Sequence, residues 1–596
     1  MQEELLPRPS ALRRWLIGAI ADRPFHGLLV IWALCCLAVY LCIAHFGRSL
    51  PWCDEWRLTP IASGEHSLSV GWLLEPANEH RAPLTRLNVF VIGRLAHWNW
   101  QAMHYVSLVF MALGALAMLC AARSIRGRST LSDSFLCLVV LTPWQWETVW
   151  QYGYAYGAAG GLTCIALSLA AVRWPQRSLT HLASYVLTVL AVSLAGGPPG
   201  NLLALGLAAA LAPGFRETAS RAWKVSAGAG ASLIVIVSGL LLAFIPSTPH
   251  HANYLSDSLL TTLKATARET VCWLGMPVLE VLWPWAFLIV LLPSLWVAGR
   301  AGRDLLAWRR GDRRPMREWL DLVPVWLAAL AVAAAIAYGR ARIPLTLWSS
   351  RYVMLTIPIG IVLYFFLVRL RAPLAFPQTL AVLMAVCCGW CWPAVLAEGK
   401  AARTRTAELV QTLTQGDVPL SDLCGRYCHD VGLSSVPDLI GWMMQMRQSD
   451  QSIFRAINRR KRRAGVPLPQ AWKADSGQLG ADWEVIPDKD ATQLRTLHVS
   501  ASGEQPALAV YHIQVPVAGA YRLCCRMRAS KEHSLTVVVD GVRIHQQTFP
   551  AAADYQPCLL ADPLRLEPGE HVLALALSRV SSDLDVVELV PQASGR

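Results

Sequence analysis

The feature that most constrains the fold is a series of about eleven apolar runs, each roughly 17–24 residues long. A single helix needs about 20 apolar residues to cross a bilayer core roughly 30 Å thick. Hydrophobic residues make up 54% of the chain and charged residues 16%, which is typical of a polytopic membrane protein. The runs lie near residues 26–46, 102–122, 131–149, 153–172, 179–196, 199–214, 224–245, 275–298, 320–338, 352–370 and 374–396.

The net charge of +13 gives these runs an orientation. Basic residues cluster in alternate connectors at the ends of the runs, and not on one soluble patch, so the charge does not indicate nucleic-acid binding. Positive connectors face the cytoplasm. The N-terminus is therefore predicted to be cytoplasmic, as an uncleaved anchor in a bacterial inner membrane. The loop 47–101, the loop 246–274 and everything after residue 398 are predicted to be periplasmic.

The first external loop is the most informative stretch. A loop of about fifty residues between two spanning helices is far longer than a connection requires, and such loops are usually functional. Asp54 and Glu55 follow the first apolar run closely, and four tryptophans lie among the charges of the loop, as expected at a membrane–water interface. The loop therefore indicates a polar reaction site at the lipid surface. Its further polar residues are Asn78, Glu79, His80, Arg81 and Arg86.

Two other predicted external segments carry charged or aromatic residues. The stretch 143–153 reads as an aromatic hairpin with one acid, Glu147, and it is either an interfacial aromatic belt or a substrate contact. Arginines on a side that is otherwise poor in positive charge indicate an anion, because a guanidinium matches the geometry of phosphate. They flank the connector between the ninth and tenth runs: Arg340, Arg342 and Arg351, followed by Tyr352.

The chain after the last apolar run has a different character. Residues 398–477 are predicted to form a helical periplasmic linker, in which the redox state of Cys424 and Cys428 is left open. From residue 478 onward, short alternating strands separated by turn residues predict an all-β sandwich. The pair Asp540-Gly541 predicts a tight hairpin. The predicted parts are therefore an N-terminal segment 1–25, a membrane domain 26–397, the linker 398–477 and the sandwich 478–596.

Taken together, residues 26–396 resemble the C-type superfamily of membrane glycosyltransferases. The carriers are the acids after the first run, the large first loop, the 143–153 hairpin and the arginines at 339–352. The resemblance implies a polyprenyl-phosphate-linked sugar donor, a surrounding membrane lipid, and a periplasmic glycan, lipid or protein as acceptor. It also implies that a first-loop acid acts on the acceptor or assists a divalent cation (Mg or Mn), and that basic residues hold the lipid phosphate.

Within this hypothesis Asp54 is the general base, since a partly desolvated carboxylate has a raised pKa suited to proton abstraction. Glu55 orients the acceptor or shares a cation with Asp54, and the alternative is that both acids cap a short helix. His80 orients by hydrogen bonding, and Glu79 is a further candidate for the catalytic set. The expected substrate-binding residues are Arg81, Arg86, Glu147, Arg340, Arg342, Arg351 and Tyr352.

The tail separately resembles jelly-roll carbohydrate-binding modules, through the strand entry 517–523, the Val539-Asp540-Gly541 turn and the turn at 566–571. It is poor in the aromatic side chains on which sugars stack, so a structural or docking role competes with glycan binding. For the whole chain, two other classes stay open: a transporter or flippase for lipid-linked sugars, and a non-catalytic assembly protein for envelope polysaccharide. The few aromatics of the tail are Trp483, Tyr511, Tyr521, Phe549 and Tyr555.

Overall fold

The structure is a computed structural model of the 596-residue chain. It describes all residues except 1–21, 77–80, 152, 173–177, 213–219, 246–254, 257, 311–318, 320, 341–351, 416–417, 429–435, 450, 464–469, 474–477, 480–482, 488–494, 500–506, 578–581 and 593–596.

The chain forms two compact units that do not follow the simple order of the sequence. The first, called here the helical unit, consists of Met1–Gly47, Leu68–Ile92 and Gln101–Ala401. The second, called here the mixed unit, combines Arg48–Ser67, Gly93–Trp100 and Ala402–Arg596. Parts of the first long loop therefore fold together with the C-terminal third of the chain.

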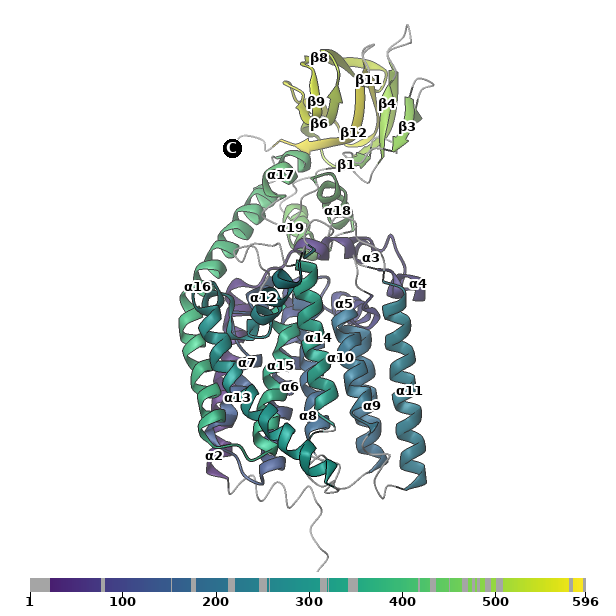
Figure 1. Cartoon of the computed structure of the whole chain (residues 1–596). Coiled ribbons are helices and arrows are strands. Elements are labelled where there is room, and N and C mark those ends of the chain that lie inside the picture. Colours follow the sequence, from purple (N-terminus) through teal and green to yellow (C-terminus); the bar gives the residue numbers. More distant parts are fainter. Residues whose placement is uncertain are drawn as a thin grey trace, which may run out of the picture. The chain divides into compact units, whose positions relative to one another are not determined.

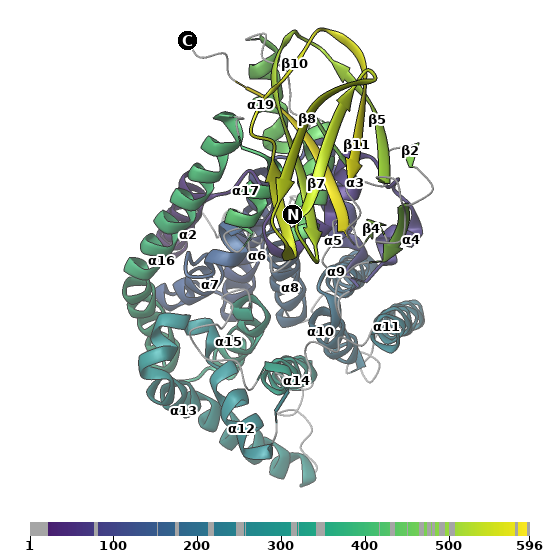
Figure 2. The same cartoon turned by 90° about the horizontal axis from the view of Figure 1, so that it is seen from above.

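The helical unit is built from α2 to α16. Helices α8, α9, α10, α14 and α15 pack on one another in this order, and α15 returns to α8, while α11 packs against α9 and α10 (Figure 2). The helices are α2 (Arg23–Phe46), α4 (Val70–Leu74), α5 (Pro83–Leu95), α6 (Trp100–Arg126), α7 (Ser134–Val140), α8 (Gly153–Ala171), α9 (Leu179–Ala195), α10 (Gly197–Ala209), α11 (Arg221–Ala243), α12 (Leu259–Glu269), α13 (Met276–Arg309), α14 (Val323–Arg340), α15 (Tyr352–Arg369) and α16 (Ala375–Gln415), with the short η2 (Leu131–Asp133), η3 (Glu147–Gln151) and η6 (Cys272–Leu274).

Six helices in the described part of the chain are long and apolar enough to cross a membrane. Four shorter apolar helices accompany them, at Leu131–Val140, Gly157–Ala171, Leu179–Ala195 and Val353–Arg369. The prediction of a helical, membrane-type part followed by a β domain is confirmed at this level. The six spans come from α2, α6, α11, α13, α14 and α16.

One predicted run, 131–149, is not a continuous helix. Helix α7 ends at Val140, and its last backbone bond is donated by Leu141 to the Cys137 carbonyl. Pro143 lacks an N–H, and a proline also disfavours helical backbone in the residue before it. The chain therefore turns there, and it becomes helical again only at η3, a single turn of π-helix over Glu147–Gln151.

The long helices of the helical unit, such as α6, α11, α13 and α14, run between two ends of this unit (Figure 1). At one end, called here the first-loop end, segments from the predicted external loops meet. Thr85 donates to the Ala195 carbonyl at 2.9 Å, and Ser256 N–H donates to the Tyr338 carbonyl at 2.9 Å. The first loop, the α9–α10 connection, the loop before α12 and the end of α14 therefore lie at the same end.

The opposite end, called here the arginine-rich end, holds buried and half-buried ion pairs between connectors. The pairs of Asp22 and Asp321 join segments far apart in the chain, and the Arg126–Asp133 pair closes the connector between α6 and η2. The pairs are Arg123 Nε with Asp22 Oδ2 at 3.1 Å, Arg126 Nη1 with Asp133 Oδ1 at 2.9 Å, and Arg369 Nη1 with Asp321 Oδ1 at 2.5 Å.

The mixed unit contains helices and two β-sheets. The strand neighbours in both sheets are antiparallel, with the order β10-β6-β12-β4-β3 in one and β2-β5-β11-β7-β8 in the other; β1 pairs with β12 and β9 with β6. The helices are η1 (Cys53–Leu58), α3 (Thr59–Ser63), α17 (Leu420–Tyr427), α18 (Val436–Gln448) and α19 (Ser452–Arg463), and the strands are β1 (Gln470–Lys473), β2 (Gln478–Leu479), β3 (Trp483–Pro487), β4 (Arg495–Val499), β5 (Ala507–Val515), β6 (Gly519–Ala529), β7 (His533–Val539), β8 (Val542–Phe549), β9 (Ala552–Leu559), β10 (Leu564–Leu566), β11 (Gly569–Leu577) and β12 (Ser582–Pro591).

The two sheets enclose one hydrophobic core, so this part is a sandwich. Strand β5 alternates buried and more exposed residues along its length, as one core-facing side requires. The predicted hairpin at Asp540-Gly541 is confirmed, because these two residues connect β7 to β8 with φ of 51° and 79°. Positive φ at both central residues is the requirement of a tight type I′ hairpin.

Strand β12 is buried along its whole length, which means that both of its faces are covered. One face belongs to the sandwich core, through residues such as Leu584 and Leu589. On the other face Glu588, 1% exposed, accepts a hydrogen bond of 2.6 Å from the backbone N–H of Leu420 at the start of α17. The helices after residue 402 are therefore packed onto the sheet.

The contact of α17 with β12 predicts a measurable difference between two fragments of the chain. A fragment starting at residue 470 retains all strands but exposes the Glu588 carboxylate, whereas one starting at residue 402 keeps the N–H of Leu420. A hydrogen bond to a charged group contributes about 1.5–3 kcal/mol. We therefore expect the β domain of 402–596 to be more stable by at least this amount in urea unfolding. Glu588→Gln should destabilise 402–596 and leave 470–596 nearly unchanged; equal effects in both fragments would contradict the contact.

Candidate functional site

Asp54 and Glu55 lie in the single turn of η1, within the mixed unit. The Glu55 side chain is buried, 1% exposed, and its Oε2 accepts a hydrogen bond of 2.9 Å from the backbone N–H of Trp52. This is the capping arrangement that the sequence left open as an alternative role for the acids, and it accounts for Glu55. The side chain of Asp54 lies outside the described part of the structure.

A segment almost four hundred residues away in the sequence holds this acid-bearing turn in place. Helix α18 packs against both η1 and α3. Gln445 on α18 donates a hydrogen bond to the Glu65 carboxylate, at a sequence separation of 380 residues. At the start of α19, the Ser452 hydroxyl donates to the Ser49 carbonyl at 2.7 Å. The helices between the last apolar run and the sandwich are therefore part of the scaffold of the first loop.

Arg81 and Arg86 lie in the helical unit and are bound to their own loop. Arg86 is 8% exposed; its Nη1 donates to the Trp72 carbonyl at 2.7 Å and to Glu75 Oε2 at 2.9 Å. Arg81 Nη1 donates to the Leu74 carbonyl at the end of α4 at 2.5 Å, and its Nε donates to the Phe244 carbonyl, directly after α11, at 3.0 Å. Both guanidinium groups thus fasten the α4 segment, which is a sufficient structural reason for their presence.

Residues 143–150 are packed inside the helical unit. Trp144 and Trp150 are 2% and 0% exposed, and the Trp150 ring lies 5.6 Å from that of Phe46. These rings are therefore core residues and do not line an exposed aromatic belt. Glu147 begins the π-helical turn and is also buried, at 6% exposure.

Arg340 is the last residue of α14, at the first-loop end. Tyr352 begins α15, but its side chain is outside the described residues, as are the whole of Glu79, His80, Arg342 and Arg351. The connector that carries these arginines therefore starts at the end of α14 and stops at the beginning of α15. Residues 341–351 between the two helices lie outside the described residues.

Glu269, which the sequence reasoning did not select, is the most unusual acid in the helical unit. It ends the amphipathic helix α12 and is fully buried. Its two carboxylate oxygens have no hydrogen-bond partner among the described residues, and Oε1 lies 4.0 Å from Arg268 Nε. Burial raises its pKa to about 8, and the Arg268 guanidinium opposes that shift. The only sign of this burial in the sequence was the position of Glu269 four residues after Ala265, which places both on the same face of α12.

Glu269 lies at the C-terminal end of α12, next to η6. The helix packs against α14, and the following η6 packs against α15. On its other side Leu259, Leu260 and Leu263 are 56–75% exposed, as in a helix lying at a membrane surface. Helix α12 therefore holds a buried carboxyl group with a raised pKa between α14 and the surface of the helical unit.

The raised pKa of Glu269 predicts a pH-dependent stability. Between its ordinary pKa of 4.5 and about 8, the folded chain holds this proton while the unfolded chain has released it. The free energy of unfolding should therefore fall as the pH rises through this window, by up to roughly 4–5 kcal/mol. Glu269→Gln should remove this slope and be more stable than wild type at pH 8. Thermal unfolding in detergent between pH 5 and 9 measures the slope and the stability difference at pH 8. If the stabilities of wild type and Glu269→Gln changed in parallel with pH, the raised pKa of Glu269 would be contradicted.

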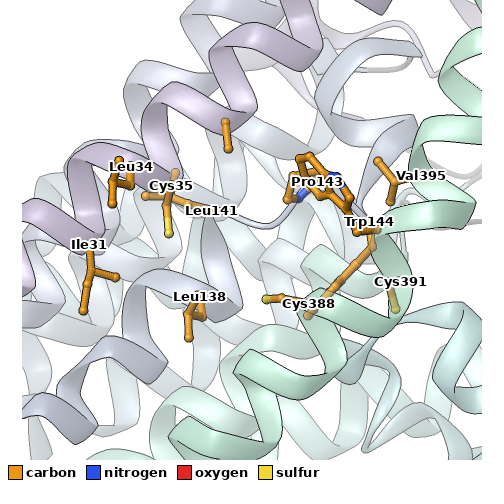
Figure 3. A pocket seen from close by; sticks show the side chains of 12 residues that line it. Ile31, Leu34, Cys35, Leu138, Leu141, Pro143, Trp144, Cys388, Cys391 and Val395 are labelled. Atoms are coloured by element: carbon orange, nitrogen blue, oxygen red, sulfur yellow. The ribbon is translucent and has the colours of Figure 1, made fainter.

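An apolar groove of about 250 Å³ lies between α2, α7 and α16 (Figure 3). Its upper wall is formed by Pro143 and Trp144, and its sides by aliphatic and cysteine side chains. The size and lining suit a hydrocarbon chain. The further residues along it are Ile31, Leu34, Cys35, Ala38, Leu138, Leu141, Cys388, Cys391, Trp392 and Val395.

The cysteines form no disulfides, and the described acids, cysteines and histidines form no metal site. All sixteen cysteines are free, including Cys424 and Cys428; the Cys424 thiol donates to the Met443 sulfur at 3.6 Å. Across the described residues, no group of three His, Cys, Asp or Glu side chains is arranged to hold a metal ion. The Glu55 carboxylate accepts a hydrogen bond from the backbone N–H of Trp52. The described residues therefore do not form a site for the expected divalent cation.

No protein-family model matches the chain, and no curated protein matches it either. Solved structures with carbohydrate-binding modules match about a fifth of it, at the C-terminal β domain. A family 35 module from Clostridium thermocellum is 13% identical, with 21% of this chain and 98% of that one covered and a TM-score of 0.19. The CBM36-1 domain of a xylanase from the hindgut metagenome of Trinervitermes trinervoides is 9% identical, covering 22% and 99%, with a TM-score of 0.18. The Podospora anserina GH26-CBM35 mannanase is 18% identical, covering 22% and 28%, with a TM-score of 0.20.

The described surface of the β domain offers few aromatic platforms. Tyr511 and Tyr521 are core residues, as predicted, each 2% exposed. Phe549 and Tyr555 are 7% and 9% exposed, and the Tyr555 ring lies under the guanidinium groups of Arg526 and Arg528. None of these four rings is free to stack on a sugar.

Proposed function

We propose that the chain is a membrane glycosyltransferase that moves a sugar from a polyprenyl-phosphate donor to an acceptor on the periplasmic side of a bacterial inner membrane. The observation that carries the proposal is the support given to the acid-bearing turn η1 by α18, a helix from the far end of the chain. A turn that only connected two spans would not need such support. In the proposal the eleven apolar runs all cross the membrane, and the first-loop end faces the periplasm.

Asp54 takes the role of general base in this scheme, because the Glu55 carboxylate already accepts the Trp52 N–H. Arg340, Arg342 and Arg351 neutralise the donor phosphate, and Tyr352 contributes to the substrate-binding surface. Glu147 is 6% exposed and is left out of this surface. The groove between α2, α7 and α16 takes part of the isoprenoid chain. No step of the scheme requires a metal.

Purified protein in vesicles, supplied with labelled polyprenyl-phosphate sugars, tests the proposal. Transfer of label to an acceptor, or to water, supports it. Movement of the intact donor across the bilayer without transfer would instead assign the chain to the flippase class. If neither occurs with any donor tested, the assembly-protein alternative replaces the enzyme.

A further inference from the structure

We propose that a cavity at the arginine-rich end of the helical unit binds a phosphate group. The cavity has a volume of about 740 Å³, within the range of small-molecule sites, and opens between the end of α6, the second half of α13, and the turn from α15 to α16. Five arginines line it, with one acid: Arg126, Arg128, Arg300, Arg369, Arg371 and Asp304.

Three of these arginines are already neutralised by acids. Each pair holds its arginine in position in the wall of the cavity. The acid of each pair also cancels the charge of its arginine, so these three arginines contribute no net positive charge. The pairs are Arg126 with Asp133 at 2.9 Å, Arg369 with Asp321 at 2.5 Å, and Arg300 with Asp304 at 3.5 Å, where Asp304 also accepts from Trp319 Nε1 at 2.8 Å.

The two remaining arginines supply the charge for a ligand. Arg128 and Arg371 are exposed, and neither has an acid partner within the described chain. Arg371 also has a left-handed backbone, with φ of 49°, directly after α15. The Ala372 N–H caps the Leu367 carbonyl at 2.9 Å, which fixes the direction of this turn. Two unneutralised guanidinium groups in one cavity match the charge and bidentate geometry of a phosphate.

Apart from Ser124, the rest of the lining is apolar, with Leu367, Leu370 and Leu374 beside the arginines. A phospholipid would use both parts, its headgroup on the arginines and its chains on the leucines. A free phosphate would use the arginines alone. The chemistry common to both is a phosphate within reach of Arg128 and Arg371. This site lies at the opposite end from Arg81, Arg340 and α12, so it is additional to the donor site of the proposed function.

The test uses the purified full-length chain in a neutral detergent at constant ionic strength. Three probes are titrated while the unfolding temperature is measured: short-chain phosphatidylglycerol, a diacylglycerol with the same chains, and inorganic phosphate. We expect the phosphate-bearing lipid, and not the diacylglycerol, to raise the unfolding temperature. Arg128→Gln/Arg371→Gln should weaken the apparent affinity by about 30-fold, from roughly 1 kcal/mol per basic residue. Its unfolding temperature without probe should stay unchanged, because neither side chain is paired.

Arg303→Gln/Arg309→Gln is the matched control, since it removes the same charge from exposed positions of α13 outside the cavity lining. It should bind the probe with wild-type affinity. Protection by inorganic phosphate with the same arginine dependence assigns a free phosphate, and protection by phosphatidylglycerol alone assigns a lipid headgroup. Equal weakening in both double variants, or no protection by either phosphate probe, would overturn the site.

Discussion

Asp54→Asn should lower the rate of sugar transfer by about 10²–10⁴-fold, the usual loss when a general base is removed. Asparagine keeps the size and hydrogen-bonding capacity of the side chain but has no basicity. Donor binding should be nearly unchanged, because the arginines proposed for the phosphate lie elsewhere in the sequence. Steady-state transfer rates, with donor binding measured separately on the same preparations, give both quantities.

The neighbouring acid provides the matched control. Glu55→Gln keeps an oxygen that accepts from Trp52 N–H, but it removes the charge from a buried cap. We expect it to lower the unfolding temperature, by the equivalent of about 1 kcal/mol, with a much smaller effect on turnover per folded molecule. Near-normal turnover by Asp54→Asn would transfer the base role to Glu55 or Glu79. If all these variants kept their activity, the first loop would not be the reaction site.

Much of the architecture could be predicted because local patterns determine it. Apolar length located the helices, and the period-two alternation and turn residues located the sandwich. The hairpin at Asp540-Gly541 was predictable from two residues, since only a few side chains accept positive φ. The break after Val140 was not predicted, although Pro143 indicates it. Hydrophobic content identifies an apolar run, but it is insensitive to the backbone N–H that a proline lacks.

The site was less accessible to such reasoning because its supports are distant in the sequence. Nothing in residues 51–58 indicates that α18 packs on them, and the mixed unit combines three separate stretches of chain. Glu269 was missed because an acid in a loop helix is ordinarily solvated, and only the packing of α12 on α14 buries it. Arg86 was assigned to substrate although Glu75, eleven residues earlier, pairs with it.

Arg369→Met should destabilise the helical unit by about 3–5 kcal/mol, the usual cost of breaking a buried ion pair from one side. Arg369 is 7% exposed, its Nη1 and Nη2 bond the two oxygens of Asp321 at 2.5 and 2.8 Å, and Nη2 also donates to the Ala171 carbonyl at 2.8 Å. Removing the guanidinium leaves a carboxylate of 8% exposure without its partner. Unfolding in detergent, in phosphate-free buffer, measures the loss.

A second substitution, at Asp321, distinguishes two causes of the lost stability: the unpaired Asp321 carboxylate and the lost packing of the Arg369 side chain. In Arg369→Met/Asp321→Leu no charge is left buried, so most of the stability should return, as hydrophobic replacements of buried pairs often show. Arg303→Met, at an exposed position of α13, should change stability by less than about 0.5 kcal/mol. A double variant as unstable as Arg369→Met would mean that the bond to Ala171, which joins the ends of α8 and α15, contributes more than the ion pair does. The arginine-rich end would then be held chiefly by its backbone contacts, and its acids would serve to neutralise the arginines around the cavity.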